Sequence, residues 1–303
     1  MSETIIEQDD SGARRPAEIS ASGWRRVLMR TWAEGSQDNI GLIAAGVAFY
    51  AFLAFVPLLA SVVLTYGLVA DPVVVAGHVQ SLFRVLPGEV ASLVAEQLRG
   101  MTEGEATPKG FALLLALLLA IYGAMRGASA VVTALNVANE VEETRSFIRS
   151  TATALLITLG TLVAVLLAAG AIGALAAVER LLPSSSPALH TLVQILFWAG
   201  AALAVSALLA TIYRYAPNRP DVRWRWLTPG SIGATLLWLA ATLGFGFYVA
   251  NFGSYNATYG SLGAVVVFLT WLYLSAYIVL MGAELNSELE KQARGDTAPC
   301  PSQ

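Results

Sequence analysis

The first long run of apolar positions extends from Asn39 to Ala70, thirty-two residues without a charged side chain. An α-helix rises about 1.5 Å per residue, so about 20 apolar residues cross a hydrocarbon core about 30 Å thick. This run therefore predicts a membrane span, and similar runs follow it. We expect an all-α, polytopic integral membrane protein with six transmembrane helices, over about residues 40–69, 110–135, 150–178, 189–213, 227–250 and 260–284.

The segments outside these runs carry most of the charge. Residues 1–38 are predicted to be a tail with an amphipathic helix over about residues 23–34, suited to the lipid headgroup layer; a juxtamembrane segment without a helix is the alternative. Residues 71–108 alternate apolar and polar positions, which indicates a helical hairpin outside the membrane or a solvated loop. Residues 39–290 form the membrane domain, and residues 291–303 a second tail.

The distribution of basic residues predicts the orientation. With a cytoplasmic N-terminus, fourteen of the eighteen lysines and arginines fall on the cytoplasmic side of six spans. We therefore expect both termini in the cytoplasm and a location in the bacterial inner membrane. The first twenty residues are polar, so the first span is expected to act as its own insertion signal.

Composition narrows the chemistry. The chain is 56% hydrophobic and 13% charged, with a mean hydropathy of +0.63, values that a water-soluble domain of this length would not reach. Cys300 is the only cysteine, and His78 and His190 are the only histidines. A disulfide framework and a thiolate or histidine metal site are therefore not expected, and neither is a cofactor.

Small residues and one proline predict how the helices pack. Residues four apart place small side chains on one helical face, where another backbone can approach closely. Pro57 falls inside the first span and predicts a kink there, although small residues and prolines are ordinary in membrane helices. The positions of predicted close packing are Gly41, Ala45, Ala44, Ala48, Gly123, Gly127, Gly260 and Gly263.

Charged and polar residues near the ends of spans are the candidates for a substrate path or a buried ion pair: Arg126, Glu284, Arg214 and Asn136. Ionisable residues inside a membrane are costly and mark pathways or buried partners. Arg126 could instead reach the headgroups with its long side chain. Glu284 could lie at the interface, with Glu288 and Glu290 following in solvent. Arg145 is expected to pair locally with the preceding acids.

A second polar cluster is predicted on the outer face, between the last two spans. Its aromatic rings suit the membrane interface, and it could also line an outer vestibule for the polar head of an amphiphile. The residues are Asn251, Tyr255, Asn256 and Tyr259.

Four segments carry a resemblance to a known family, namely AAGVAFYAFLAFVPLL (44–59), LNVANEVEETRSF (135–147), YAPNRPDVRWRWLTPGSIGATLLWL (215–239) and FYVANFGSYNATYGSLGAVVVFLTWLYLSAYIVLMGAELNSEL (247–289). Over about residues 25–290 the chain resembles the YihY / virulence factor BrkB family of bacterial inner-membrane proteins. The resemblance implies six membrane helices. It also implies a link to serum resistance and to envelope or lipid A export phenotypes, under a family label that was formerly ribonuclease BN.

Enzymatic activity is not expected. Metal-dependent phosphodiester cleavage needs converging carboxylates or histidines, and no span holds a carboxylate before Glu284. The loop around residues 214–225 is basic, but the positive-inside rule already accounts for its arginines, so no nucleic acid partner is expected. The leading hypothesis is a transporter or flippase-like factor for a lipid or other amphiphile in envelope biogenesis. The alternative is a non-transporting scaffold or assembly factor that binds other inner-membrane proteins or a second copy of itself.

Overall fold

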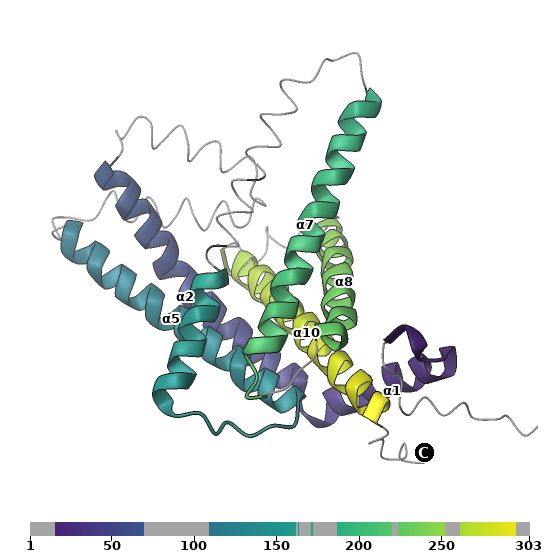
Figure 1. Ribbon diagram of the computed structural model, residues 1–303. Coiled ribbons are helices and arrows are strands. Elements are labelled where there is room, and N and C mark those ends of the chain that lie inside the picture. Colours follow the sequence, from purple (N-terminus) through teal and green to yellow (C-terminus); the bar gives the residue numbers. More distant parts are fainter. Residues whose placement is uncertain are drawn as a thin grey trace, which may run out of the picture. The chain divides into compact units, whose positions relative to one another are not determined.

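The computed structural model describes residues 16–69, 109–161, 163, 171, 187–219, 224–251 and 261–294. Within these ranges every regular element is helical (Figure 1). The elements are η1 (Pro16–Glu18), α1 (Ala21–Gln37), α2 (Ile40–Val69), α5 (Lys109–Ala138), α7 (Pro187–Tyr215), α8 (Trp224–Asn251) and α10 (Ser261–Arg294), with a shorter apolar helix over Phe147–Thr161. The predicted all-α class is confirmed for the part of the chain that the structure describes.

Four described helices are long and apolar enough to cross a membrane, over Leu114–Ala138, Ala188–Tyr215, Thr228–Val249 and Val265–Arg294. A fifth span results if α1 and the first part of α2 count as one bent span. Of the span predicted over residues 150–178, the structure describes the part up to residue 161 and residues 163 and 171. The hairpin predicted over residues 71–108 lies outside the described residues.

The chain divides into two compact units. The first contains residues 1–43, 131–240 and 277–303, and the second contains residues 44–130 and 241–276. The boundary falls within α2, α5, α8 and α10, so each of these helices contributes residues to both units.

In the first unit, α1 begins at a capped end and is held by a small apolar core. The Ser20 side chain accepts a hydrogen bond from the backbone N–H of Gly23 at 3.0 Å, which satisfies one of the free donors of the first turn. The core consists of Ile19, Val27 and Leu289, with Trp24, Leu285 and Ala293 packed against it. These contacts place α1 beside the C-terminal part of α10.

A two-residue break separates α1 from α2. At the end of α1, the backbone N–H of Asp38 donates to the carbonyl of Glu34 at 2.8 Å, and that of Asn39 donates to the carbonyl of Ser36 at 3.3 Å. Asn39 has a φ of 55°, a left-handed conformation that asparagine adopts more readily than most residues. The predicted amphipathic helix over residues 23–34 lies within α1.

In the second unit, glycine and aromatic residues bring helices together. A Cβ on Gly123 of α5 would lie 2.9 Å from the Cα of Ala54 on α2, so only glycine permits this approach. Four residues further along α5, a Cβ on Gly127 would lie 3.8 Å from the Cβ of Tyr50. The ring of Phe268 on α10 lies 4.6 Å from that of Phe55, centroid to centroid.

The small residues of α2 are not all buried. Ala44 and Ala48 are buried, whereas Gly41 is half-buried and Ala45 is exposed. The buried face of α2 therefore contains Ala44 and Ala48. Gly263 on α10 is buried, and Gly260 lies outside the described residues. α2 runs through position 57, and the kink predicted at Pro57 stays a prediction.

Candidate functional site

The C-terminal part of α10 is lined with buried polar side chains. Glu284 and Glu288 are each 1% exposed, and Glu290 is 8% exposed. The same stretch buries Asn286, Ser287 and Gln292. The expectation that Glu288 and Glu290 lie in solvent is therefore wrong, because Arg30 of α1 pairs with Glu288 and Arg219, which follows α7, pairs with Glu290.

Arg30 of α1 is the first of these partners. Its Nε donates to Glu288 Oε2 at 2.9 Å, and its Nη2 donates to Gln292 Oε1 at 2.6 Å. The side chains of Arg30 and Glu288 are only 12% and 2% exposed. Lys291 lies on the other side of this pair, with its Nζ 2.7 Å from Glu288 Oε1 and 2.8 Å from Glu140 Oε1. Glu288 therefore has a cation on each of its carboxylate oxygens.

Arg219, which follows α7, provides a second link. Its guanidinium group donates to the carboxylate of Glu290 and to the side-chain oxygen of Asn139, next to the end of α5. Arg294 also donates to Glu290, at 2.7 Å. This arrangement ties the ends of α5, α7 and α10 together through one arginine.

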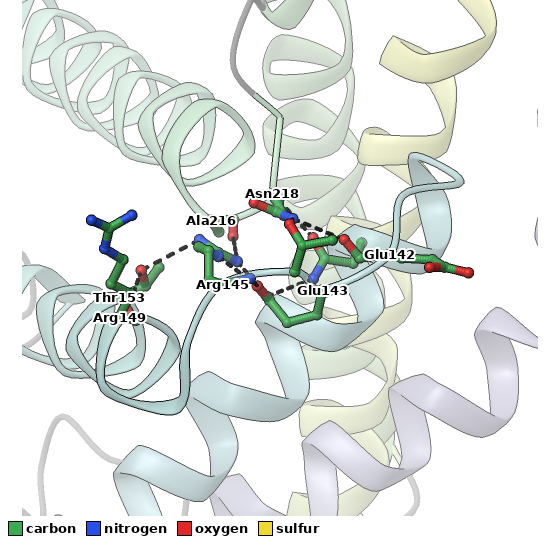
Figure 2. A network of polar contacts seen from close by, with 9 residues as sticks. Glu142, Glu143, Arg145, Arg149, Thr153, Ala216 and Asn218 are labelled. Carbon is green, nitrogen blue, oxygen red and sulfur yellow. Dashed lines mark hydrogen bonds and ion pairs between the residues drawn. The ribbon is translucent and has the colours of Figure 1, made fainter.

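Arg145 forms the centre of a connected network at the start of the helix Phe147–Thr161 (Figure 2). Its Nε and Nη2 donate to the two carboxylate oxygens of Glu143, at 2.7 and 2.6 Å. Nη2 also donates to the carbonyl of Ala216 at 2.9 Å, and Nη1 to Thr153 Oγ1 at 3.3 Å. The predicted local pairing of Arg145 with a preceding acid is confirmed, and the same arginine also reaches the end of α7.

Asparagines complete this network. The backbone N–H of Asn218 donates to Asn136 Oδ1 at 2.7 Å, and its side chain donates to the carbonyl of Glu142 at 2.8 Å. Asn136, which is 5% exposed, in turn donates to Glu143 Oε2 at 2.9 Å. The hydrogen bonds from Arg145, with that from Asn136, lower the pKa of Glu143 to about 2.

Glu284 lies one helical turn before Glu288 and has a different environment. The charged residues around it include Asp38, Glu34 and Lys291. Its Oε1 is buried and has no hydrogen-bond partner. A buried carboxyl oxygen without a partner is uncommon and calls for a physical explanation.

The same part of α10 is held against α7 and α8 at close range. The backbone N–H of Gly230 donates to Asn286 Oδ1 at 2.8 Å. The hydroxyl of Tyr213 donates to the carbonyl of Val279 at 2.6 Å. A Cβ on Gly282 would lie 2.6 Å from the Tyr213 hydroxyl oxygen and 2.9 Å from the carbonyl oxygen of Gly230. These contacts fix the position of the buried acids.

The predicted site residues separate into groups. Asn136 belongs to the polar network of the first unit, and Glu284 is buried in the same unit. The Arg214 guanidinium, also in this unit, lies over the Tyr215 ring, 5.6 Å from its centroid. Arg126 belongs to the second unit, is exposed, and donates to the hydroxyl of Tyr122 at 3.1 Å. A pair between Glu284 and either arginine stays a prediction. Asn251 ends α8, and the other predicted vestibule residues, Tyr255, Asn256 and Tyr259, lie outside the described residues.

Four further residues of the network were not singled out from the sequence: Arg30, Asn139, Asn218 and Arg219. Their partners are far away along the chain, 258 positions for Arg30 and Glu288 and 82 for Asn218 and Asn136. No local periodicity could reveal such pairs. Among the described residues, no group of three or more His, Cys, Asp or Glu side chains is arranged to hold a metal ion.

The long apolar helices with a buried polar end define a multi-pass helical membrane protein, in keeping with the bacterial inner membrane. The chain belongs to the virulence factor BrkB family, whose model matches residues 31–302.

Curated relatives fit this assignment. The ribonuclease-like protein YfkH of Bacillus subtilis is 30% identical over 191 residues, which are 61% of this chain and 68% of that protein. A UPF0761 membrane protein of Paraburkholderia xenovorans is 39% identical over 92 residues, 30% of this chain and 21% of the relative. One of Tolumonas auensis is 35% identical over 78 residues, 26% of each chain. The chain thus spans about a quarter or less of these UPF0761 relatives. No solved structure matches it.

Proposed function

We propose that this chain is a six-span inner-membrane protein, with both termini in the cytoplasm, that binds and moves a lipid or other amphiphile during envelope biogenesis. Its action would be that of a transporter or flippase-like factor. Membrane lipids are its expected partners, and the proposal includes neither a nucleic acid partner nor an enzymatic activity. The ribonuclease-like name belongs to YfkH and is not carried over.

One observation carries the proposal. Glu284 lies within the candidate span Val265–Arg294, is 1% exposed, and leaves one carboxyl oxygen without a partner. Ionisable side chains inside membrane helices cost free energy, about 2.5–3.5 kcal/mol at the centre of a span on insertion scales, and they generally line pathways or binding sites. For a scaffold that only packs against neighbouring membrane proteins, helix faces of small residues, such as those on α5 and α2, would suffice. The buried carboxyl therefore favours the handling of a polar group.

The arginine contacts support the proposed orientation. Arg30, Arg145, Arg219 and Arg294 come from segments that the positive-inside rule assigns to the cytoplasm. All four belong to the first unit, where they bind partners at the ends of α5, α7 and α10. A polar end of this kind suits the cytoplasmic headgroup region, from which an amphiphile would enter.

Native mass spectrometry with lipid analysis of the gently purified protein tests the proposal. The comparison is between wild type, Glu284→Ala, Arg126→Ala and the control Glu142→Gln, which changes an exposed side chain. We expect the wild type to retain one lipid class selectively, and Glu284→Ala to lose it while keeping its fold. Retention of bulk lipid only, unchanged in every variant, would overturn the proposal in favour of a membrane scaffold.

A further inference from the structure

Arg126 lies in the middle of a candidate membrane span. The span runs from Leu114 to Ala138, so twelve residues separate Arg126 from either end. At about 1.5 Å per residue, each end lies about 18 Å away along the helix axis, which exceeds the length of an arginine side chain. Reaching the headgroups beyond an end of α5 therefore does not by itself account for this charge.

The face of α5 that carries Arg126 is exposed. Arg126 and Tyr122 are both exposed, and one turn earlier Leu118 is 57% exposed. These three residues are four positions apart, so they lie one above another on one face. A different face of α5 packs against α2 through Gly123. In a helix that crosses a membrane, an exposed face with such apolar side chains meets lipid rather than water.

Tyr122 holds the guanidinium group of Arg126 in place. Nε of Arg126 donates to the Tyr122 hydroxyl at 3.1 Å, and the guanidinium carbon lies 5.3 Å from the centroid of the same ring. The hydrogen bond uses one of the five N–H donors of the group. Among the residues that the structure describes, no carboxylate pairs with Arg126 and no acceptor bonds to its two Nη atoms. Four donors and a positive charge are thus presented on the exposed face.

The arginines of the first unit are arranged differently. Arg30, Arg145 and Arg219 each pair with a glutamate. Arg126 lies in the second unit and has no such partner in the described part of the chain. An ionisable side chain inside a membrane is costly unless it is paired. The lipid that meets this face of α5 can supply the missing anion.

We infer that Arg126, positioned by Tyr122, binds the phosphate group of a membrane lipid on the exposed face of α5. A guanidinium group can donate two parallel hydrogen bonds to phosphate oxygens, and such charge-assisted bonds are stronger than neutral ones. Phosphate is the anion that bilayer phospholipids carry, and Leu118 offers an apolar surface to their acyl chains. The inference rests on the proposed function for an amphiphile as ligand, and it assigns that amphiphile a phosphate headgroup.

Titration of the full chain in detergent with lipid, read by native mass spectrometry, tests this site. The probes are phosphatidylglycerol and a diacylglycerol with the same acyl chains but no phosphate. We expect the wild type to bind phosphatidylglycerol at least about tenfold more tightly than diacylglycerol, and Arg126→Gln to bind phosphatidylglycerol about tenfold more weakly than the wild type. The control Arg149→Gln removes the same charge from an exposed position outside the four candidate spans and should bind as the wild type does.

Three results would overturn the inference: equal affinity of the wild type for the two lipids, equal affinity of the wild type and Arg126→Gln for phosphatidylglycerol, or an equal loss in Arg149→Gln, which would indicate a general attraction between charges. Phosphatidylglycerol should also stay bound in an excess of inorganic phosphate, and its displacement would indicate a site for a soluble anion instead. The comparison of the two lipids needs no variant, so it decides the matter even if Arg126→Gln fails to fold.

The titration records binding and not transfer, which separates this inference from the proposed function. A wild type that binds phosphatidylglycerol selectively but moves no lipid between leaflets contradicts only the proposed function. A wild type that moves lipid without preferring phosphatidylglycerol to diacylglycerol contradicts only the phosphate site.

Discussion

In the first unit α8 and α10 approach each other closely at Gly230, which makes Gly230→Ala a sharp perturbation. A Cβ at position 230 would lie 2.1 Å from the carbonyl oxygen of Gly282 and 2.5 Å from both Cγ and Oδ1 of Asn286. The atoms at Gly282 are backbone and cannot rotate away. The helices would have to separate by about 1 Å to reach an ordinary contact distance.

Three terms set the size of the effect. Overpacking a well-packed interior costs about 1–3 kcal/mol. Separation also lengthens the 2.8 Å hydrogen bond from the Gly230 N–H to Asn286, and leaving a buried polar group unpaired costs about 1–3 kcal/mol. Replacing glycine by alanine in a helix gains about 1 kcal/mol. We therefore expect Gly230→Ala to lower the free energy of unfolding by about 1–5 kcal/mol.

The matched control is Gly244→Ala on the same helix, where a Cβ meets no atom within 4 Å. The apparent Tm of both variants and of the wild type is measured in detergent, with size-exclusion chromatography after heating as the readout. Gly230→Ala should melt several degrees lower, and Gly244→Ala at the wild-type temperature or above. If both variants shift Tm in the same direction and by the same amount, the close approach of α8 and α10 is refuted.

Three further predictions concern the polar network and use the same assay. Arg145→Lys keeps the charge but loses the two paired donors to Glu143, so we expect the free energy of unfolding to fall by about 1–3 kcal/mol. An unchanged Tm would contradict the stabilising role of these two hydrogen bonds. The pKa of Glu143 is lowered from 4.5 to about 2, so ionised Glu143 stabilises the folded protein. This contribution to the free energy of unfolding is complete above pH 4.5 and is lost as the pH falls toward 2. Glu143→Gln should flatten that part of the Tm-against-pH curve, and an unaltered slope would count against the shift. Arg30→Ala leaves Glu288 buried with one cation fewer and should cost about 3–5 kcal/mol, whereas Arg25→Ala, on the exposed face of the same helix, should cost little. Equal effects of the two would exclude the buried pair.

Long apolar helices could be predicted from the sequence because a single window reveals a continuous apolar run. α2 spans residues 40–69, the same range as the predicted first span, and α5, α7 and α8 lie within a few residues of theirs. α10 extends ten residues beyond the predicted end at residue 284. The helix was expected to run on toward Arg294 in solvent, whereas Arg30 and Arg219 cover Glu288 and Glu290 inside the first unit.

The polar site was less predictable. Asn136 and Glu284 stood out because polar side chains at the ends of apolar runs are conspicuous. Asn218 and Arg219 gave no such signal, because each lies in a short polar segment where its residue type is ordinary. Their importance comes from contacts with helices that are distant in the sequence, and only the folded arrangement brings these together.

We proposed that the chain moves an amphiphile by means of the buried polar end of α10. The most direct measurement is the transfer of a headgroup-labelled phospholipid between the leaflets of proteoliposomes, detected with a membrane-impermeant quencher. We expect faster transfer with the wild type than in protein-free vesicles, a clear loss with Glu284→Ala, and transfer at the wild-type rate with Gly244→Ala. Transfer by the wild type no faster than in protein-free vesicles would contradict it.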